Sequence, residues 1–320
     1  MLESRIDFSQ LNEKVQALRD AIAGLIVGQQ QAVDLLLVAV LSEGHVLLEG
    51  VPGVAKTLMA KLLASAIDAK FSRIQFTPDL MPSDITGSSV YRPDRGEFEF
   101  RPGPAFANII LTDEINRAPA KTQAALFEVM EEKQITYDGV TYPMSYPFMV
   151  IATQNPIDQE GTYRLPEAQL DRFIFKIKVG YPDMEQETEI MQRHNSGLFI
   201  RNPEMPKVLD AAVIRELRSA IQNVFVKPEL MRYIAELVTA TRGNPALYMG
   251  ASPRASVALL AASKAWAAMS GRDFITPEDI QELAYPVLRH RIMPSPEKEM
   301  EGLGPDELVK QILQKIEIPR

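Results

Sequence analysis

The chain has 320 residues, of which 46% are hydrophobic and 24% are charged. This length predicts two domains, at roughly 100–200 residues per domain, and the composition excludes a disordered protein. There is no cysteine, which excludes disulfides and thiolate metal sites. The 34 basic and 42 acidic residues give a net charge of −8, which disfavours nucleic acid as a partner because proteins that bind it usually present a basic face.

The sequence shows no sign of a membrane segment or a secretory leader. The first nine residues are polar and mixed in charge, without an apolar stretch behind them. The longest apolar run, Leu35–Leu41, is far shorter than the ~20 residues that a membrane helix needs. We therefore expect a cytoplasmic protein with no transmembrane segment.

The first part of the chain alternates between helical and strand patterns. Apolar residues at helical spacing predict helices over 11–26 and 30–42, and later ones over 56–67 and 122–132. Short apolar runs predict five strands, over 45–48, 71–76, 108–112, 147–153 and 173–179. Such alternation is typical of a parallel sheet with helices on both faces.

Two stretches interrupt this alternation and read as β-hairpins. The segment 88–100 alternates around the turn Pro93-Asp94-Arg95-Gly96. The segment 134–146 contains Asp138-Gly139, a strong hairpin turn signal. From these residues alone, both hairpins are most simply surface decorations, since loops tolerate insertions.

After Asp183 we expect only helices. They are predicted over 184–195, 210–223, 228–241, 253–269, 277–285 and 305–315. The sequence therefore predicts an α/β domain over residues 1–195, followed by a smaller all-α domain over residues 196–320.

The loop after the first strand has the features of a phosphate-binding loop. It reads Gly50-Val-Pro-Gly-Val-Ala-Lys-Thr57, which differs from the common Walker A pattern in having Ala55 in place of glycine. Its glycines allow backbone N–H groups to face phosphates, Lys56 would meet the β- and γ-phosphates, and the Thr57 hydroxyl would bind Mg²⁺. The alternative is an ordinary Gly-Pro turn before a helix.

Polar residues at the ends of two later strands support the first interpretation. The apolar strand 108–112 is followed by Asp113, which would hold Mg²⁺, and Glu114, which would activate the attacking water. Asn155, after the fourth strand, would orient that water, although an Asn-Pro turn is an equally good explanation for this residue alone. Two such patterns on buried strands of one α/β domain predict a nucleotide hydrolase.

Together these motifs resemble those of the MoxR family of AAA+ ATPases. The resemblance rests on Gly50–Thr57, with Ala55 as a mark of the family, and on Leu111–Pro119, Ala152–Pro156, Gly161–Phe173 and Ser252–Arg254. It implies an AAA+ P-loop domain carrying two β-hairpin inserts, followed by an all-α lid domain, and it recasts the hairpins as pore or substrate elements. It also implies ATP as the nucleotide, although the choice of adenine over guanine rests on the resemblance alone.

The resemblance further implies roles for individual residues. Asn155 would be sensor 1, on a strand between those of the two Walker motifs. Arg254 would be sensor 2, reaching from the lid to the γ-phosphate. Arg172 would be the arginine finger for the neighbouring subunit's nucleotide, with Arg164 as the competing candidate and an ion pair with Asp171 as the mundane role. The residues expected around the nucleotide are Val27, Gly28, Gly50, Pro52, Gly53, Val54, Ala55, Lys56, Thr57 and Leu58.

As a whole, the resemblance implies a hexameric, Mg²⁺-dependent ATPase that remodels or matures client proteins as a chaperone. Its expected partners include a protein with a von Willebrand factor A domain. Two other functions stay open from the sequence: a nucleic-acid translocase, against which the acidic charge argues, and a nucleotide-bound scaffold that does not hydrolyse, against which Glu114, Asn155 and Arg172 argue.

Overall fold

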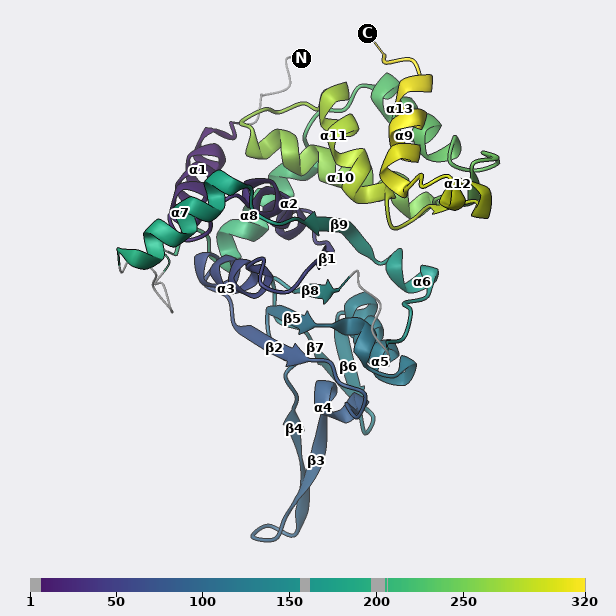
Figure 1. Cartoon of the computed structure of the whole chain (residues 1–320). Helices are drawn as coiled ribbons and strands as arrows, with labels where there is room; N and C mark the ends of the chain where they lie inside the picture. The colour runs from purple at the N-terminus through teal and green to yellow at the C-terminus, as the bar shows by residue number, and fades with distance from the viewer. Residues whose placement is uncertain (1–6, 156–161, 197–204, 206, 320) are drawn as a thin grey trace.

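A five-stranded parallel sheet forms the centre of the amino-terminal part (Figure 1). The computed structural model describes residues 7–155, 162–196, 205 and 207–319. The strands lie in the order β2-β5-β8-β1-β9, so the expected α/β fold is confirmed. Their bounds are β1 His45–Gly50, β2 Phe71–Gln75, β5 Ile109–Asp113, β8 Met149–Gln154 and β9 Phe173–Val179.

Both faces of this sheet are buried, because successive residues of a strand point to opposite faces. In β1, Val46 and Leu48 join one apolar core, whereas Leu47 between them joins the other. The same alternation in β5 places Ile109 and Leu111 on the first face and Ile110 on the second. The strands are therefore continuous apolar runs.

Helices cover the two faces unequally. The first face packs against α1, α2, α3 and most of the carboxy-terminal helices, and the second face against α5 and the short α4. The helices up to residue 196 are α1 Ser9–Ala23, α2 Gln30–Leu41, α3 Lys56–Ala66, α4 Pro82–Thr86, α5 Ala120–Glu132, α6 Glu167–Leu170 and α7 Met184–Asn195. The short helix α4 was not predicted, because it is only about one turn long.

The carboxy-terminal part is helical, as expected, and shares one core with the first face of the sheet. Its helices are α8 Ala211–Gln222, α9 Pro228–Thr239, α10 Pro253–Met269, α11 Pro277–Leu288, α12 Pro296–Met300 and α13 Pro305–Lys315. The expectation that strands stop after Asp183 was wrong: β10 (Leu247–Met249) and β11 (Met293–Pro294) pair antiparallel. Both strands are too short to give an alternating pattern. The boundary at residues 195/196 stays a prediction.

Both predicted hairpins are present. The first consists of β3 (Gly87–Arg92) and β4 (Glu97–Pro102), and it projects away from the sheet in Figure 1. The second consists of β6 (Gln134–Tyr137) and β7 (Val140–Pro143). They are joined by aromatic rings: Phe100 of the first hairpin lies 4.9 Å from Tyr137 and 4.8 Å from Tyr142 of the second, between ring centroids.

A buried histidine connects three elements of the sheet domain. His45 Nδ1 accepts a hydrogen bond from the backbone N–H of Val150 at 2.9 Å, and Nε2 lies 3.1 Å from the carbonyl oxygen of Met130. This pairing fixes the neutral ring with the proton on Nε2. Burial lowers the pKa of His45 from 6.5 to about 4.

The low pKa of His45 predicts acid sensitivity of the fold. Between pH 6.5 and about 4 the unfolded chain binds a proton here and the folded chain does not, so stability present above pH 6.5 is lost as the pH falls. Through this residue, the free energy of unfolding should be about 3 kcal/mol higher at neutral pH than below pH 4. His45→Gln, which cannot titrate, should flatten the dependence of the unfolding free energy on pH in this window, as measured by urea unfolding. An unchanged pH slope would contradict this assignment.

Candidate nucleotide site

The Gly50–Thr57 loop joins the carboxyl end of β1 to the first turn of α3. Gly53 has φ of +90°, a left-handed conformation that favours glycine. A Cβ on Gly50 would collide with the carbonyl oxygen of Val179 in β9, so this position needs glycine for a different reason. Ala55 has φ of +61° without being glycine, a strained conformation of the kind that clusters at functional sites.

The side chain of Lys56 folds back onto the start of this loop. Its Nζ donates hydrogen bonds to the carbonyl oxygens of Gly50 and, at 3.2 Å, of Val51. Burial lowers the pKa of Lys56, while Asp113, Glu114 and Glu49 act in the opposite direction. The ammonium group is therefore partly desolvated and close to both candidate catalytic carboxylates, where it can bind a phosphate group strongly.

Asp113, at the end of β5, is held by two neighbours. Its Oδ2 accepts a hydrogen bond from Arg73 Nε of β2 at 2.6 Å, and its Oδ1 accepts one from Thr153 Oγ1 of β8 at 3.3 Å. Because β2 and β8 flank β5, these contacts follow directly from the strand order. They orient the carboxylate at the carboxyl edge of the sheet.

Glu114 follows with φ of +56°, so the chain turns sharply as it leaves β5. Its backbone N–H donates to Thr153 Oγ1 at 3.0 Å. Its Oε2 accepts a hydrogen bond from Gln75 Nε2 at 3.2 Å and lies 3.1 Å from Arg117 Nε. Glu114 therefore sits beside Asp113 as an oriented carboxylate.

Asn155 directly follows β8, and β8 lies between β5 and β1, as the resemblance implied. The register pairs Gln154 with Glu49, which puts the half-buried Asn155 level with Gly50. The sheet therefore places Asn155 between the phosphate-binding loop and Asp113. The next motif residue, Pro156, lies outside the described residues.

Two pockets meet at Gly28, close to the expected base-binding segment. One, of about 450 Å³, is lined by Gly28, Gln29, Gly180, Tyr181 and, from α11, Tyr285. The other, of about 360 Å³, is lined by Val27, Gly28 and residues of α1 and α7. Gln29 Nε2 donates to the carbonyl oxygen of Gly180 at 3.3 Å, which ties this segment to the end of β9.

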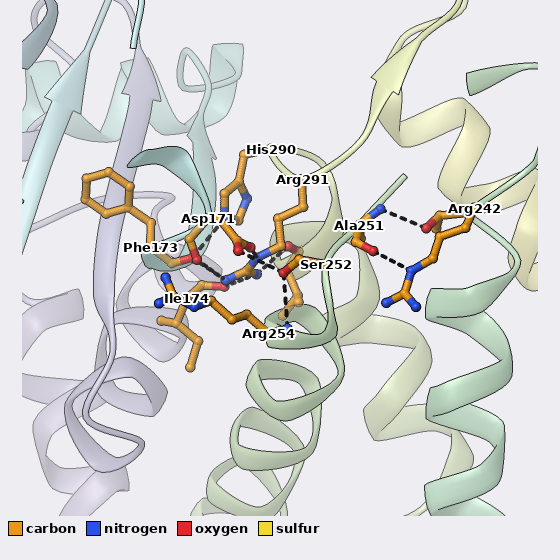
Figure 2. A network of polar contacts seen from close by, with 11 residues as sticks. Asp171, Phe173, Ile174, Arg242, Ala251, Ser252, Arg254, His290 and Arg291 are labelled. Atoms are coloured by element: carbon orange, nitrogen blue, oxygen red, sulfur yellow. Dashed lines mark hydrogen bonds and ion pairs between the residues drawn. The ribbon is translucent and has the colours of Figure 1, made fainter. Parts of the chain in front are cut away.

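A buried polar network fixes the helical part to the opposite, amino end of β9 (Figure 2). Arg291 donates from Nε to Asp171 Oδ1 at 2.8 Å, and its Nη2 donates to the carbonyl oxygens of Phe173, at 2.6 Å, and Asp171, at 3.1 Å. Ser252 Oγ donates to Asp171 Oδ2 at 2.8 Å and caps α10 by accepting from the N–H of Arg254. Asp171 therefore binds Arg291 and Ser252 and does not form the ion pair with Arg172 that was considered from the sequence.

Arg172 and Arg254 both approach one carboxylate, that of Glu131 in α5. Arg254 Nη2 lies 2.8 Å from Glu131 Oε1, and Arg172 Nε lies 3.5 Å from Oε2. Arg172 also donates to the carbonyl oxygen of Phe127. In this structure Arg254 is thus placed beside Arg172 and not beside the loop of its own chain.

The register of β1 and β9 separates these arginines from Lys56. His45 pairs with Phe173 and Gly50 with Val179, so Arg172 precedes one end of β9 and the phosphate-binding loop lies at the other. At ~3.3 Å per residue, that separation is roughly 20 Å. Arg164 lies elsewhere, exposed at a cavity of about 470 Å³ that Leu165, Met249 and Met293 also line.

Four site residues were missed from the sequence: Arg73, Gln75, Glu131 and Arg291. Arg73 and Gln75 flank the buried Ile74 on β2, and such polar residues on a strand could have indicated an edge strand that borders the site. Glu131 and Arg291 gave no such signal. The partners of Glu131 lie 41 and 123 residues away along the chain, and Asp171 lies 120 residues before Arg291.

Comparisons with known proteins agree with this fold. Residues 45–175 match the family described as ATPase family associated with various cellular activities (AAA), and residues 239–315 match the AAA lid domain. The chain is 46% identical to the uncharacterized protein YeaC of Bacillus subtilis, over 92% of each chain. It is also 46% identical to the chaperone MoxR1 of Mycobacterium tuberculosis, over 92% of this chain and 80% of that one. A solved structure from Cytophaga hutchinsonii superposes with a TM-score of 0.89 at 45% identity, covering 97% of this chain and 96% of that one.

The fold, the site and these matches define an AAA+ ATPase. Within that class, the chain belongs to the MoxR family. Among the described residues, no helix is long and apolar enough to cross a membrane.

The Arg291 network predicts a large stability effect. Arg291→Ala would leave the partly buried Asp171 carboxylate and the carbonyl oxygens of β9 without their cation, and breaking a buried ion pair typically costs about 3–5 kcal/mol. We expect a loss of that size in the free energy of unfolding measured in urea. Arg232→Ala, which removes an exposed pair with Glu236, is the control and should change it by less than about 1 kcal/mol. Equal effects of the two substitutions would refute this role of Arg291.

Proposed function

We propose that this ATPase uses Mg²⁺-dependent ATP hydrolysis to remodel or mature client proteins, as a chaperone. The observation that carries the proposal is the convergence of Lys56, Asp113, Glu114 and Asn155 at the carboxyl edge of three adjacent strands. The relatives support the chaperone role, since one of them bears that name.

The donor set fits a magnesium nucleotide. The Thr57 hydroxyl and the Asp113 carboxylate are hard oxygen ligands of the kind that Mg²⁺ prefers, with phosphates completing the shell. When bound, Mg²⁺ would neutralise charge on the phosphates. Asp113 would then exchange its contact with Arg73 for the ion, and Lys56 would exchange the carbonyl oxygens of Gly50 and Val51 for phosphate oxygens.

Glu114 is the proposed general base. Its contacts with Gln75 and Arg117 hold the carboxylate at the edge of the sheet, where a water attacking the γ-phosphate would lie. Asn155, level with Gly50, would orient that water. The base-binding segment at Val27 and Gly28 would border the adenine.

The arginines are proposed to serve a neighbouring subunit. With Arg172 roughly 20 Å along β9 from the loop of its own chain, it cannot reach its own γ-phosphate. Arg254 shares Glu131 with it and is placed in the same way. We therefore assign both to the nucleotide of the adjacent subunit of a ring, for which we propose a hexamer.

The projecting hairpin favours a protein client. The tip region of β3–β4 exposes Tyr91 and Phe98, whose ring centroids lie 5.3 Å apart. Its charges are mixed, with three arginines and three acidic residues between 92 and 101, so it lacks the basic face expected for phosphate backbones. We propose that the hairpins contact cytoplasmic client proteins and that a von Willebrand factor A domain protein is a partner.

Binding and chemistry should separate in two variants. Glu114→Gln keeps the size of the side chain but removes the base, so ATP binding should persist while turnover falls by ~10²–10⁴. Lys56→Ala should instead weaken ATP binding about tenfold or more, because a charge-assisted hydrogen bond is lost. Calorimetric titration and phosphate release measure the two effects. Near wild-type turnover of Glu114→Gln would remove Glu114 as the base.

The position of Arg172 predicts complementation between subunits. Arg172→Ala should fold, bind ATP and hydrolyse it slowly, since an arginine finger typically contributes ~10³–10⁵ in rate. Lys56→Ala has a defective site but an intact arginine. In mixed rings, the site of an Arg172→Ala subunit can face a Lys56→Ala neighbour, so phosphate release should recover on mixing.

The mixing experiment needs proof that the rings are mixed, for example by co-purification of differently tagged subunits. If mixed rings form and no activity returns, the action of Arg172 in trans is wrong. Arg164 is then the next residue to test in the same way.

A further inference from the structure

Glu131 is the shared acceptor of the two arginines. It lies in the last turn of α5, and each of its carboxylate oxygens faces a different guanidinium: Oε1 faces Arg254 from the lid, and Oε2 faces Arg172 beside β9. The side chain is 37% exposed, so this junction lies at the surface.

The backbones of both arginines are fixed independently of Glu131. Arg172 lies between Asp171 and Phe173, whose oxygens are bound by the buried Arg291. Arg254 lies in the first turn of α10, capped by Ser252, which itself donates to Asp171. The two backbone segments are thus anchored to each other, so Glu131 can act only on the ends of the two side chains.

The guanidinium groups are held less firmly than the backbones, although Arg172 also donates to the carbonyl oxygen of Phe127 in α5. Arg254 is 54% exposed and Arg172 is 29% exposed. Two guanidinium groups brought to one place repel each other, so Arg254 would turn away from Arg172 unless an anion lies between them. Glu131 is the anion that supplies this attraction to both.

We propose that Glu131 is a positioning residue, which holds Arg172 and Arg254 together as one pair directed at the γ-phosphate of the neighbouring subunit. The inference rests on the proposed action of these arginines in trans. Glu131 does not touch the phosphate, since the two anions repel. It keeps both guanidinium groups at the surface until the more highly charged phosphate replaces it as their acceptor, an exchange that is easy because exposed ion pairs are weak.

The alternative is that Glu131 merely helps to fasten the lid to α5. The two roles differ in which nucleotide site suffers when Glu131 is changed. A fastening role affects the stability of the chain that carries the change. A positioning role affects turnover in the adjacent subunit's site.

The variant to measure is Glu131→Gln, which keeps the size of the side chain and removes its charge. We expect kcat to fall roughly tenfold to hundredfold, since small misplacement of a catalytic group has effects of that size. The KM for ATP and the thermal unfolding midpoint should stay near wild type. Glu131→Asp, which keeps the charge, should lose less, and Glu128→Gln, an exposed acid on the same helix, is the matched control and should change neither value.

Mixing then decides between the roles. Glu131→Gln combined with Lys56→Ala should regain phosphate release, because the Lys56→Ala neighbour offers an intact pair of arginines. Recovery supports the positioning role. If Arg172→Ala recovers on mixing but Glu131→Gln does not, the inference about Glu131 is overturned and the action in trans stands. If neither recovers in proven mixed rings, the arrangement of arginines under the proposed function fails, and the inference fails with it. An unchanged kcat in Glu131→Gln also overturns it.

Discussion

The buried contact between Arg291 and the start of β9 determines how the two parts of this ATPase are arranged. Arg291 is almost fully buried, and burial lowers its pKa while Asp171 raises it. A cation in such a place is stable only when it is paired and fully hydrogen-bonded, and here one carboxylate and several backbone carbonyl oxygens meet that need. The carbonyl groups of Asp171, Phe173 and Ile174 belong to β9 and the residues before it, and that of Val287 belongs to α11, so Arg291 fastens α11 to the start of β9.

The register of β9 and the docking of the lid place the candidate site residues in two sets. Lys56, Asp113 and Glu114 gather at the carboxyl edge of the sheet, where parallel strands of α/β folds place their ligands. Arg172 and Arg254 gather at the other end of β9. Under the proposed function, a single chain holds two complementary parts of a hydrolytic site at opposite edges of the sheet, which is the arrangement that a closed ring would bring together.

The sequence predicted the sheet well because its strands are buried on both faces. Continuous apolar runs such as Ile109–Leu111 have few alternative explanations in a chain of this size, and the phosphate-binding loop and Asp113 follow such runs directly. The short elements α4, α12, β10 and β11 were missed because two to five residues carry no periodicity. Contacts between distant segments were missed for another reason. Nothing near Glu131 indicates that two arginines will approach it, since the position of β9 brings Arg172 there and the docking of the lid brings Arg254.

The same physical limit applies to the direction in which Arg254 points. Its cap at Ser252 was readable from local residues, and the structure confirms the helix start. Its neighbours depend on Asp171, to which that cap is bonded, 81 residues earlier in the chain. Local chemistry fixed where the helix begins, whereas the tertiary network decides which nucleotide the side chain can approach.

The aromatic contact between the two hairpins joins them into one structural unit. Phe100, near the base of the projecting hairpin, stacks on Tyr142 and lies against Tyr137, so it contacts β6–β7 along the length of that hairpin. The second hairpin begins at Gln134, three residues after Glu131, at the end of the stiff helix α5. Under the proposed function, a displacement of Tyr91 or Phe98 at the projecting end would be transmitted, through these rings and the end of α5, toward the residue between the two arginines. Contact with a client and the orientation of the arginines would then be mechanically coupled.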